Sequence, residues 1–157
     1  MSPVVGVGVD AVDVARFARV LERRPNLARR CFTTTEQSDA QASTDVVQSL
    51  AARFAAKEAV MKALGRGLGA FRWTDVEVCR RGGTGSASGA PSLVLRGAAA
   101  QLAAQRGAAD LQLSLTHTDT VALAFVVAQD SSTVVGVAHA APTAVAETQD
   151  APPCCPS

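Results

Sequence analysis

The sequence has few of the residues on which zinc-binding, disulfide-rich or nucleic-acid-binding proteins depend. Four of its 157 residues are cysteines and two are histidines. They form neither a C-x-x-C pair nor a set with zinc-site spacing. There is no tyrosine and only one tryptophan, so aromatic side chains do not interleave with the basic ones as in proteins that stack on nucleic-acid bases. These shortages argue against a zinc module, a disulfide scaffold and a nucleic-acid-binding protein.

Long hydrophobic runs and an excess of one charge are also missing. No apolar run reaches the roughly 20 residues that cross a bilayer, and MSPVVGVGVDAVD lacks the basic segment and apolar core of a signal peptide. The chain has 15 lysines and arginines and 14 acidic residues, so its net charge is +1, and hydrophobic residues make up 48% of it. We therefore expect a cytoplasmic protein with a real core, reduced cysteines, no membrane segment and no nucleic-acid partner.

Composition divides the chain at about residue 130. Residues 1–130 carry regular hydrophobic periodicity and are long enough to form one domain. Residues 131–157 are rich in alanine, proline, threonine and valine with little periodicity, so we expect a mostly disordered tail. Within this tail, VVGVAHA (134–140) is a candidate for one additional strand.

The order of the periodic segments predicts an α+β fold. The polar segment 31–45 is loop-like, although its TTTEQ has the form of a cap for a short turn. Helices alternate with hairpin-like strand pairs, which favours a largely antiparallel sheet packed with one long and two shorter helices. The predicted strands are 3–9, 73–80, 92–96, 111–117 and 121–129, and the predicted helices are 12–24, 46–64 and 98–107.

The long predicted helix contains RFAAKEAVMKALGRG (53–67), in which charged residues adjoin the apolar stripe. Lys57 lies within that stripe, between Phe54 and Met61. It either extends its ammonium outward along the apolar surface or reaches a negatively charged ligand. Glu58 and Lys62 are four residues apart, the spacing of an ordinary exposed ion pair. Taken alone, these residues do not choose between a structural and a functional role.

Two further segments carry candidate functional residues. GVGVDA (6–11) satisfies the dinucleotide pattern G-x-G-x-x-A, but Asp10 would stand where a pyrophosphate should bind, and the chain has too few βα units for a doubly wound sheet. Asp10 and Asp13 are therefore either helix caps or, for Asp10, a functional carboxylate. His117, at the end of LQLSLTH, is either a hydrogen-bonded structural residue or part of a site.

The segment 14–30 is strongly basic. It contains six arginines and one glutamate, so its local net charge is +5, whereas the whole chain has a net charge of +1. This is either a solvated helix face or a docking surface for an acidic partner, whose approach such charge would accelerate. The arginines are Arg16, Arg19, Arg23, Arg24, Arg29 and Arg30.

Three blocks together resemble the holo-acyl-carrier-protein synthase family of phosphopantetheinyl transferases, of the short trimeric type. They are GVGVDAVDVARF (6–17), RFAAKEAVMKALGRG (53–67), and LSLTHT (113–118) followed by VALAFVV. The resemblance covers about residues 3–129 and leaves out the tail. It implies an enzyme that transfers the 4′-phosphopantetheine arm of coenzyme A to a serine of an apo acyl carrier protein, in fatty acid or related biosynthesis, and releases adenosine 3′,5′-bisphosphate.

The resemblance also implies roles for the catalytic residues. Asp10 and Glu58 match the positions that hold Mg²⁺, a hard cation suited to carboxylate and phosphate oxygens, and Lys62 matches the lysine at the phosphates. The general base is less clearly implied, because some relatives have an acidic residue directly after the histidine where this chain has Thr118. A metal-bound water or Glu58 is the first choice for that role and His117 the second.

The same resemblance implies binding residues and partners. We expect a homotrimer with each active site between neighbouring subunits, and an acidic carrier protein docked on Arg16, Arg19 and Arg23. The residues expected to bind coenzyme A are Arg53, Lys57, Gly65, Gly67, Pro91, Ser114 and Thr116, beside His117. The alternatives are a catalytically silent module that binds coenzyme A and carrier, and an NAD(P)-dependent oxidoreductase that relies on GVGVDA.

Overall fold

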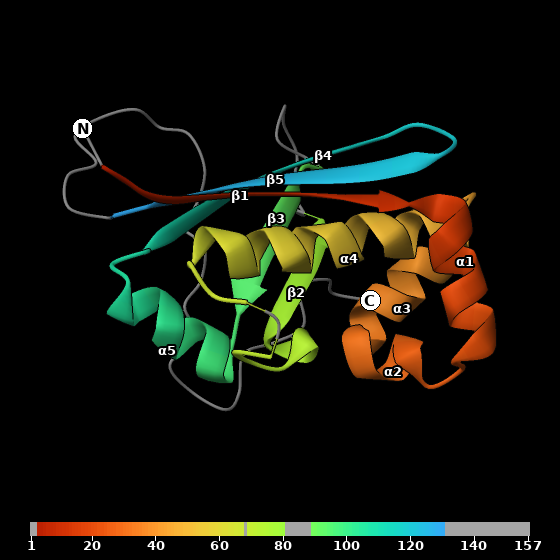
Figure 1. Ribbon diagram of the computed structural model, residues 1–157, viewed down its shortest axis with the longest axis horizontal. Coiled ribbons are helices and arrows are strands. Elements are labelled where there is room, and N and C mark those ends of the chain that lie inside the picture. The colour runs from red at the N-terminus through yellow and green to blue at the C-terminus, as the bar shows by residue number, and fades with distance from the viewer. Residues whose placement is uncertain (1–2, 68, 81–88, 131–157) are drawn as a thin grey trace.

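The computed structural model describes residues 3–67, 69–80 and 89–130. A three-stranded sheet covers one side of the long helix α4, and the remaining elements lie on its other sides (Figure 1). The predicted α+β class with antiparallel sheets is confirmed, while the tail 131–157, including 134–140, lies outside the described residues. The elements are β1 Val4–Asp13, α1 Val14–Arg23, α2 Leu27–Cys31, α3 Thr34–Gln41, α4 Val46–Ala63, the 3₁₀ turn η1 Trp73–Asp75, β2 Val76–Arg80, β3 Pro91–Leu95, α5 Gly97–Gln105, β4 Asp110–His117 and β5 Val121–Gln129.

The strands form two separate antiparallel sheets. The larger one has the order β1-β5-β4, with the apolar β5 in the centre and β1 and β4 as edges. The smaller one pairs β2 with β3, from Val76 opposite Leu95 to Arg80 opposite Pro91. The strand predicted at 73–80 begins only at Val76, because residues 73–75 form a 3₁₀ turn.

Helix α4 lies unusually close to β1 because two glycines face it. A Cβ atom on Gly8 would stand 1.8 Å from the carbonyl oxygen of Ala59, and one on Gly6 would stand 1.9 Å from that of Ala63. Gly6 therefore faces the end of α4 and Gly8 the turn before it, so strand and helix run antiparallel. These glycines match a dinucleotide-binding pattern in sequence, but in the structure they allow the backbones of β1 and α4 to pack closely.

The polar segment 31–45 is more helical than its composition predicts. It contains the last residue of α2 and all of α3, where Thr33 and Glu36 form a capping box. The prediction of a loop was wrong there, because these short helices depend on caps and neighbours more than on an apolar stripe. Asp13 caps α1 by accepting a hydrogen bond from the Arg16 amide, which is the helix-cap role considered for it.

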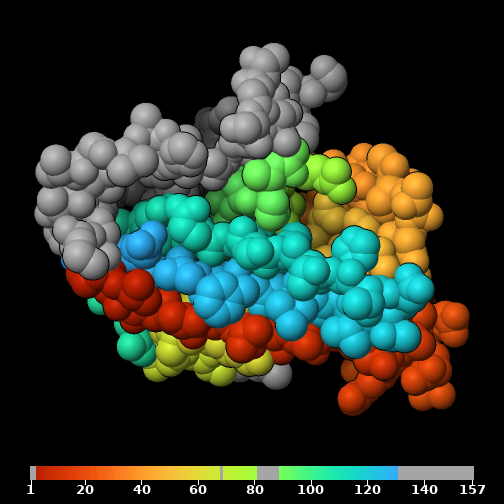
Figure 2. All heavy atoms as spheres, turned by 90° about the horizontal axis from the view of Figure 1, so that it is seen from above, coloured from red at the N-terminus to blue at the C-terminus, as the bar shows by residue number. Residues whose placement is uncertain are grey.

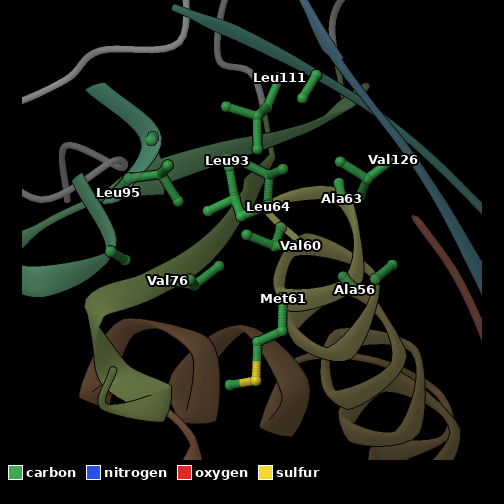
Figure 3. Packing of buried hydrophobic residues seen from close by; sticks show 14 of the residues in the cluster. Ala56, Val60, Met61, Ala63, Leu64, Val76, Leu93, Leu95, Leu111 and Val126 are labelled. Atoms are coloured by element: carbon green, nitrogen blue, oxygen red, sulfur yellow. The ribbon is translucent and has the colours of Figure 1, made fainter. Parts of the chain in front are cut away.

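The main core fills the space between α4 and the smaller sheet. Val60 and Leu64 from α4 point toward Val76 and Leu93 (Figure 3), and Met61 and Leu95 belong to the same buried cluster. A second cluster, around Phe17, Phe32 and Leu50, joins α1, α2 and the first half of α4. Both cores immobilise α4, whose two sides carry the charged residues considered below.

The close contact between β1 and α4 predicts that Gly8→Ala is strongly destabilising. The added methyl group would overlap backbone atoms that cannot move aside, so we expect a loss of about 2 kcal/mol or more in the free energy of unfolding. Urea denaturation measures this loss. Gly67→Ala is the matched control, because no atom lies within 4 Å of its added Cβ, and equal midpoints for the two variants would contradict the packing account.

Candidate active site

Asp10 and Lys62 are joined across the contact between β1 and α4. Asp10 lies on the strand face that Gly8 and Val12 share, toward the helix. The Lys62 ammonium donates to Asp10 Oδ1 at 2.9 Å and to the Val9 carbonyl oxygen at 2.8 Å. Lys62 thus pairs with the strand carboxylate rather than with Glu58, and its side chain remains half exposed.

Glu58 completes an acidic pair beside this lysine. Burial raises the pKa of its carboxyl group, the negative charge of Asp10 raises it further, and Lys62 offsets part of the rise. The two carboxylates are therefore close enough to repel each other, and a cation between them would relieve that repulsion.

The donor set at this pair suits Mg²⁺. Mg²⁺ is commonly held by one or two carboxylates together with substrate phosphates. In the part of the chain that the structure describes, no group of three His, Cys, Asp or Glu residues is placed to hold a metal by itself. Asp10 and Glu58 thus fit a magnesium site that a phosphate ligand completes.

A separate pocket of about 370 Å³ lies beside the first half of α4. Arg53 on its wall is only 6% exposed, donates to Ser49 and faces Asp39 at 3.6 Å. The Arg53 Nε has no hydrogen-bond partner among the described residues. A guanidinium on a pocket wall is suited to an anionic ligand. The other walls come from β2, β3 and β4 and include Val78, Cys79, Arg80, Pro91, Leu115 and His117.

The acidic pair and the pocket lie on different sides of α4. Lys62 follows Arg53 by nine residues, which at about 100° per residue places the two on opposite faces of the helix. Asp10 belongs to edge strand β1, whereas His117 belongs to the other edge strand, β4. A single chain therefore brings Asp10, Glu58 and Lys62 together, and separately groups Arg53, Pro91 and His117.

The remaining residues predicted to bind coenzyme A lie in two further places. Ser114 is paired with exposed Phe125, and Thr116 with Leu123, so both face away from α4 on the outer side of the sheet. Gly65 and Gly67 directly follow α4, one turn beyond Lys62, and Gly65 has a positive φ of 64°. Of these four, only the two glycines follow the helix that carries Glu58 and Lys62.

Lys57 requires a correction, because it does not reach a ligand. Its side chain is fully buried, and its ammonium donates to Glu36 Oε2 at 2.7 Å and to the carbonyl oxygens of Trp73 and Val76 at 2.9 and 2.5 Å. All three donors are thus used inside the fold. Sequence reasoning missed Glu36, although two signals pointed to it: a lysine in an apolar stripe needs a buried partner, and TTTEQ is a capping box.

The basic segment forms an exposed surface at one end of the molecule. All six of its arginines are exposed, and Arg16, Arg19 and Arg23 lie on α1, while Val14 and Phe17 of this helix are buried. Within the described residues, none of the six makes a salt bridge. Helix α1 follows β1 directly (Figure 1), so this surface continues from the strand that carries Asp10.

Comparison with known proteins gives consistent matches. Residues 6–126 match the family described as the 4′-phosphopantetheinyl transferase superfamily. A holo-[acyl-carrier-protein] synthase of Frankia casuarinae is 52% identical over 126 residues, 80% of this chain and 98% of the relative. The enzyme of the same name from Clavibacter sepedonicus is 49% identical over 124 residues, 79% of this chain and 94% of the relative.

A solved structure extends this likeness to the fold. The holo-(acyl-carrier-protein) synthase of Bacillus anthracis, crystallised in complex with CoA (3′,5′-ADP), superposes with a TM-score of 0.64 at 27% identity, over 83% of this chain and all of that one. No helix in the described ranges combines the length and apolarity that crossing a membrane requires.

The raised pKa of Glu58 predicts that its charge costs stability when no metal is bound. The folded chain holds this proton more tightly than the unfolded chain, so stability falls as the pH rises from the ordinary glutamate range through the raised pKa. Without divalent cations at pH 7.5, Glu58→Gln should therefore unfold at a higher temperature than the unaltered protein.

The thermal midpoints of the two proteins should converge as the pH is lowered through the ordinary glutamate range. Glu22→Gln, on the exposed face of α1, is the matched control and should behave like the unaltered protein. A Glu58→Gln protein that is less stable at pH 7.5 would contradict the assigned cause.

Proposed function

The chain belongs to the 4′-phosphopantetheinyl transferase superfamily and is a phosphopantetheinyl transferase, and from this premise we propose its reaction. It moves the 4′-phosphopantetheine arm of coenzyme A to a serine hydroxyl of an apo acyl carrier protein and releases adenosine 3′,5′-bisphosphate. The convergence of Asp10, Glu58 and Lys62 is the observation that carries this proposal. The names of the similar proteins agree with it.

Asp10 and Glu58 would hold Mg²⁺ at the diphosphate of coenzyme A. When bound there, the ion supplies Lewis-acid stabilisation of the charge that develops on the phosphate oxygens. Lys62 contributes a second positive charge. Its side chain is half exposed and long enough for the ammonium to turn from Asp10 toward a phosphate. The Gly65–Gly67 turn at the end of the same helix is proposed as a further contact with coenzyme A, because glycine lets backbone approach a ligand closely.

The proton of the carrier serine passes to Glu58 in this proposal. Its carboxylate stands beside the proposed metal site, at the place where the serine hydroxyl has to react, and is therefore the first candidate to accept this proton. The serine oxygen forms a bond to the phosphorus that carries the pantetheine arm, and the bond from that phosphorus to the bridging oxygen breaks. Adenosine 3′,5′-bisphosphate leaves with the electron pair beside Lys62. His117 is the second candidate for the proton.

The pocket beside α4 would bind the nucleotide end of coenzyme A. Its guanidinium, from Arg53, and its imidazole, from His117, suit a phosphate group, and Pro91 offers an apolar wall to an adenine ring. A volume of about 370 Å³ accommodates part of such a ligand rather than all of it.

A homotrimer would join the two halves of the site. The outer face of β1 and β5 is apolar, with Val7, Val9 and Phe125 exposed by 52%, 48% and 41%, and these two strands run side by side in Figure 2. Such a face marks an interaction surface. If three copies pack these faces together, the acidic pair of one subunit can meet the pocket of the next.

The carrier protein would dock on α1. An acidic carrier is attracted by Arg16, Arg19 and Arg23, which are exposed and face no carboxylate within the described ranges. Because α1 follows the strand that holds Asp10, a carrier bound there is on the side of the molecule where its serine must react.

The proposed reaction predicts Mg²⁺-dependent transfer to an apo carrier. Incubation with coenzyme A, MgCl₂ and the carrier should add one phosphopantetheine to it, as intact mass spectrometry detects. Asp10→Asn should lower the rate by at least about 100-fold, because the variant loses one of the two carboxylates proposed to hold Mg²⁺ at the phosphates.

The matched control for Asp10→Asn is Asp13→Asn in the same strand, which keeps a good helix cap and should transfer at nearly the unaltered rate. The proposal would be contradicted if none of several apo carriers gained the mass of phosphopantetheine. Binding of coenzyme A without transfer would favour the silent module instead.

A further inference from the structure

A fully buried ion pair between Glu36 and Lys57 joins four elements behind the pocket. Besides the Lys57 ammonium, the Glu36 carboxylate accepts from the backbone amide of Thr33 at 2.9 Å and from that of Val78 at 2.9 Å. Lys57 in turn donates to carbonyl oxygens of η1 and β2. The pair therefore connects α3, α4, η1 and β2 with every donor of the ammonium in use.

A second ion pair runs parallel to the first and lies at the pocket. Asp39 follows Glu36 by three residues on α3, and Arg53 precedes Lys57 by four on α4, so each pair of residues shares a helix face. Arg53 faces Asp39 at 3.6 Å and lines the pocket. The buried pair thus acts one helical turn behind the guanidinium that would meet the ligand.

The opposite wall of the pocket is held by the same buried pair. Val78 donates its backbone amide hydrogen to Glu36, and it lines the pocket together with the next two residues of β2. Arg80 is opposite Pro91 in the strand register, so the position of β3 follows that of β2. The Glu36–Lys57 pair consequently sets the separation between α4 on one side of the pocket and the β2–β3 sheet on the other.

We propose that Glu36 and Lys57 are positioning residues that hold Arg53 and the β2 wall at the separation required to bind the nucleotide end of coenzyme A. This inference rests on the proposed function. A buried ion pair gives little net stability over apolar side chains of similar volume, so fold stability alone does not account for it. Glu58 is next to Lys57 in the sequence but lies on the side of α4 that carries the acidic pair, and it is proposed to act in the transfer itself. Loss of the buried pair should therefore weaken binding of coenzyme A more than it lowers turnover.

The test compares KM for coenzyme A with kcat in the double variant Glu36→Gln with Lys57→Met. Removing both charges leaves no unpaired ion in the core. We expect KM to rise about 10-fold or more, since misplaced binding groups carry penalties of this size, while kcat stays within about threefold. Calorimetric titration with coenzyme A should show the same loss of affinity without turnover.

Two further variants complete the experiment. Leu102→Ala on α5, away from the pocket, destabilises the main core and should leave KM unchanged. Glu36→Asp keeps both charges but shortens the reach to Val78, so KM should rise about threefold or more. This variant decides the matter if circular dichroism shows that the double variant does not fold.

The inference is overturned if the folded variants bind coenzyme A within twofold of the unaltered protein. It is equally overturned if their KM and kcat change only as those of Leu102→Ala do. Failure of the proposed function has a different signature, because the unaltered protein would then transfer nothing to the carrier. The positioning role is supported only by weaker binding in variants of a protein that itself transfers.

Discussion

The direct contact between the backbones of α4 and β1 is the constraint on which the rest of the structure depends. Because Gly6 and Gly8 have no side chains, the carbonyl oxygens of Ala63 and Ala59 approach the strand closely. This closeness brings a lysine of the helix within 2.9 Å of Asp10 on the strand and places a second carboxylate beside them. A larger residue at either glycine would separate the groups proposed to act on the diphosphate.

The same helix divides the candidate site. Its strand-facing side carries Glu58 and Lys62, and its opposite side carries Arg53 in the pocket, with the buried Glu36–Lys57 pair behind. In the proposed function, a rigid helix separates the acidic pair from the pocket, so an isolated chain would lack a complete site. The apolar outer face of β1 and β5 would supply the contact between copies of the chain in the proposed trimer.

Much of the fold was predictable, because strands and helices with a strong apolar period depend on local sequence. The extents of α4, β4 and β5 follow from such patterns. The prediction of a strand at 3–9 was too short, because β1 continues to Asp13, and α3 has no apolar stripe and depends on its cap. Contacts between distant segments were harder. Helical spacing pairs Lys62 with Glu58, yet the closer partner is Asp10, 52 residues away. Lys57 likewise has its partner, Glu36, 21 residues away. Sequence gives the face of a helix on which a residue lies, but not the element that covers that face.

Subunit complementation tests the central claim, a site shared between neighbouring copies, most directly. One chain would carry Asp10→Asn and the other Arg53→Met with His117→Ala, and each alone should be inactive. In random mixed trimers from co-expression at equal levels, about a quarter of the sites would combine two intact halves. We predict about a quarter of the unaltered transfer rate. A mixture no more active than the two variants measured separately would show that each chain forms its own site and would contradict the account.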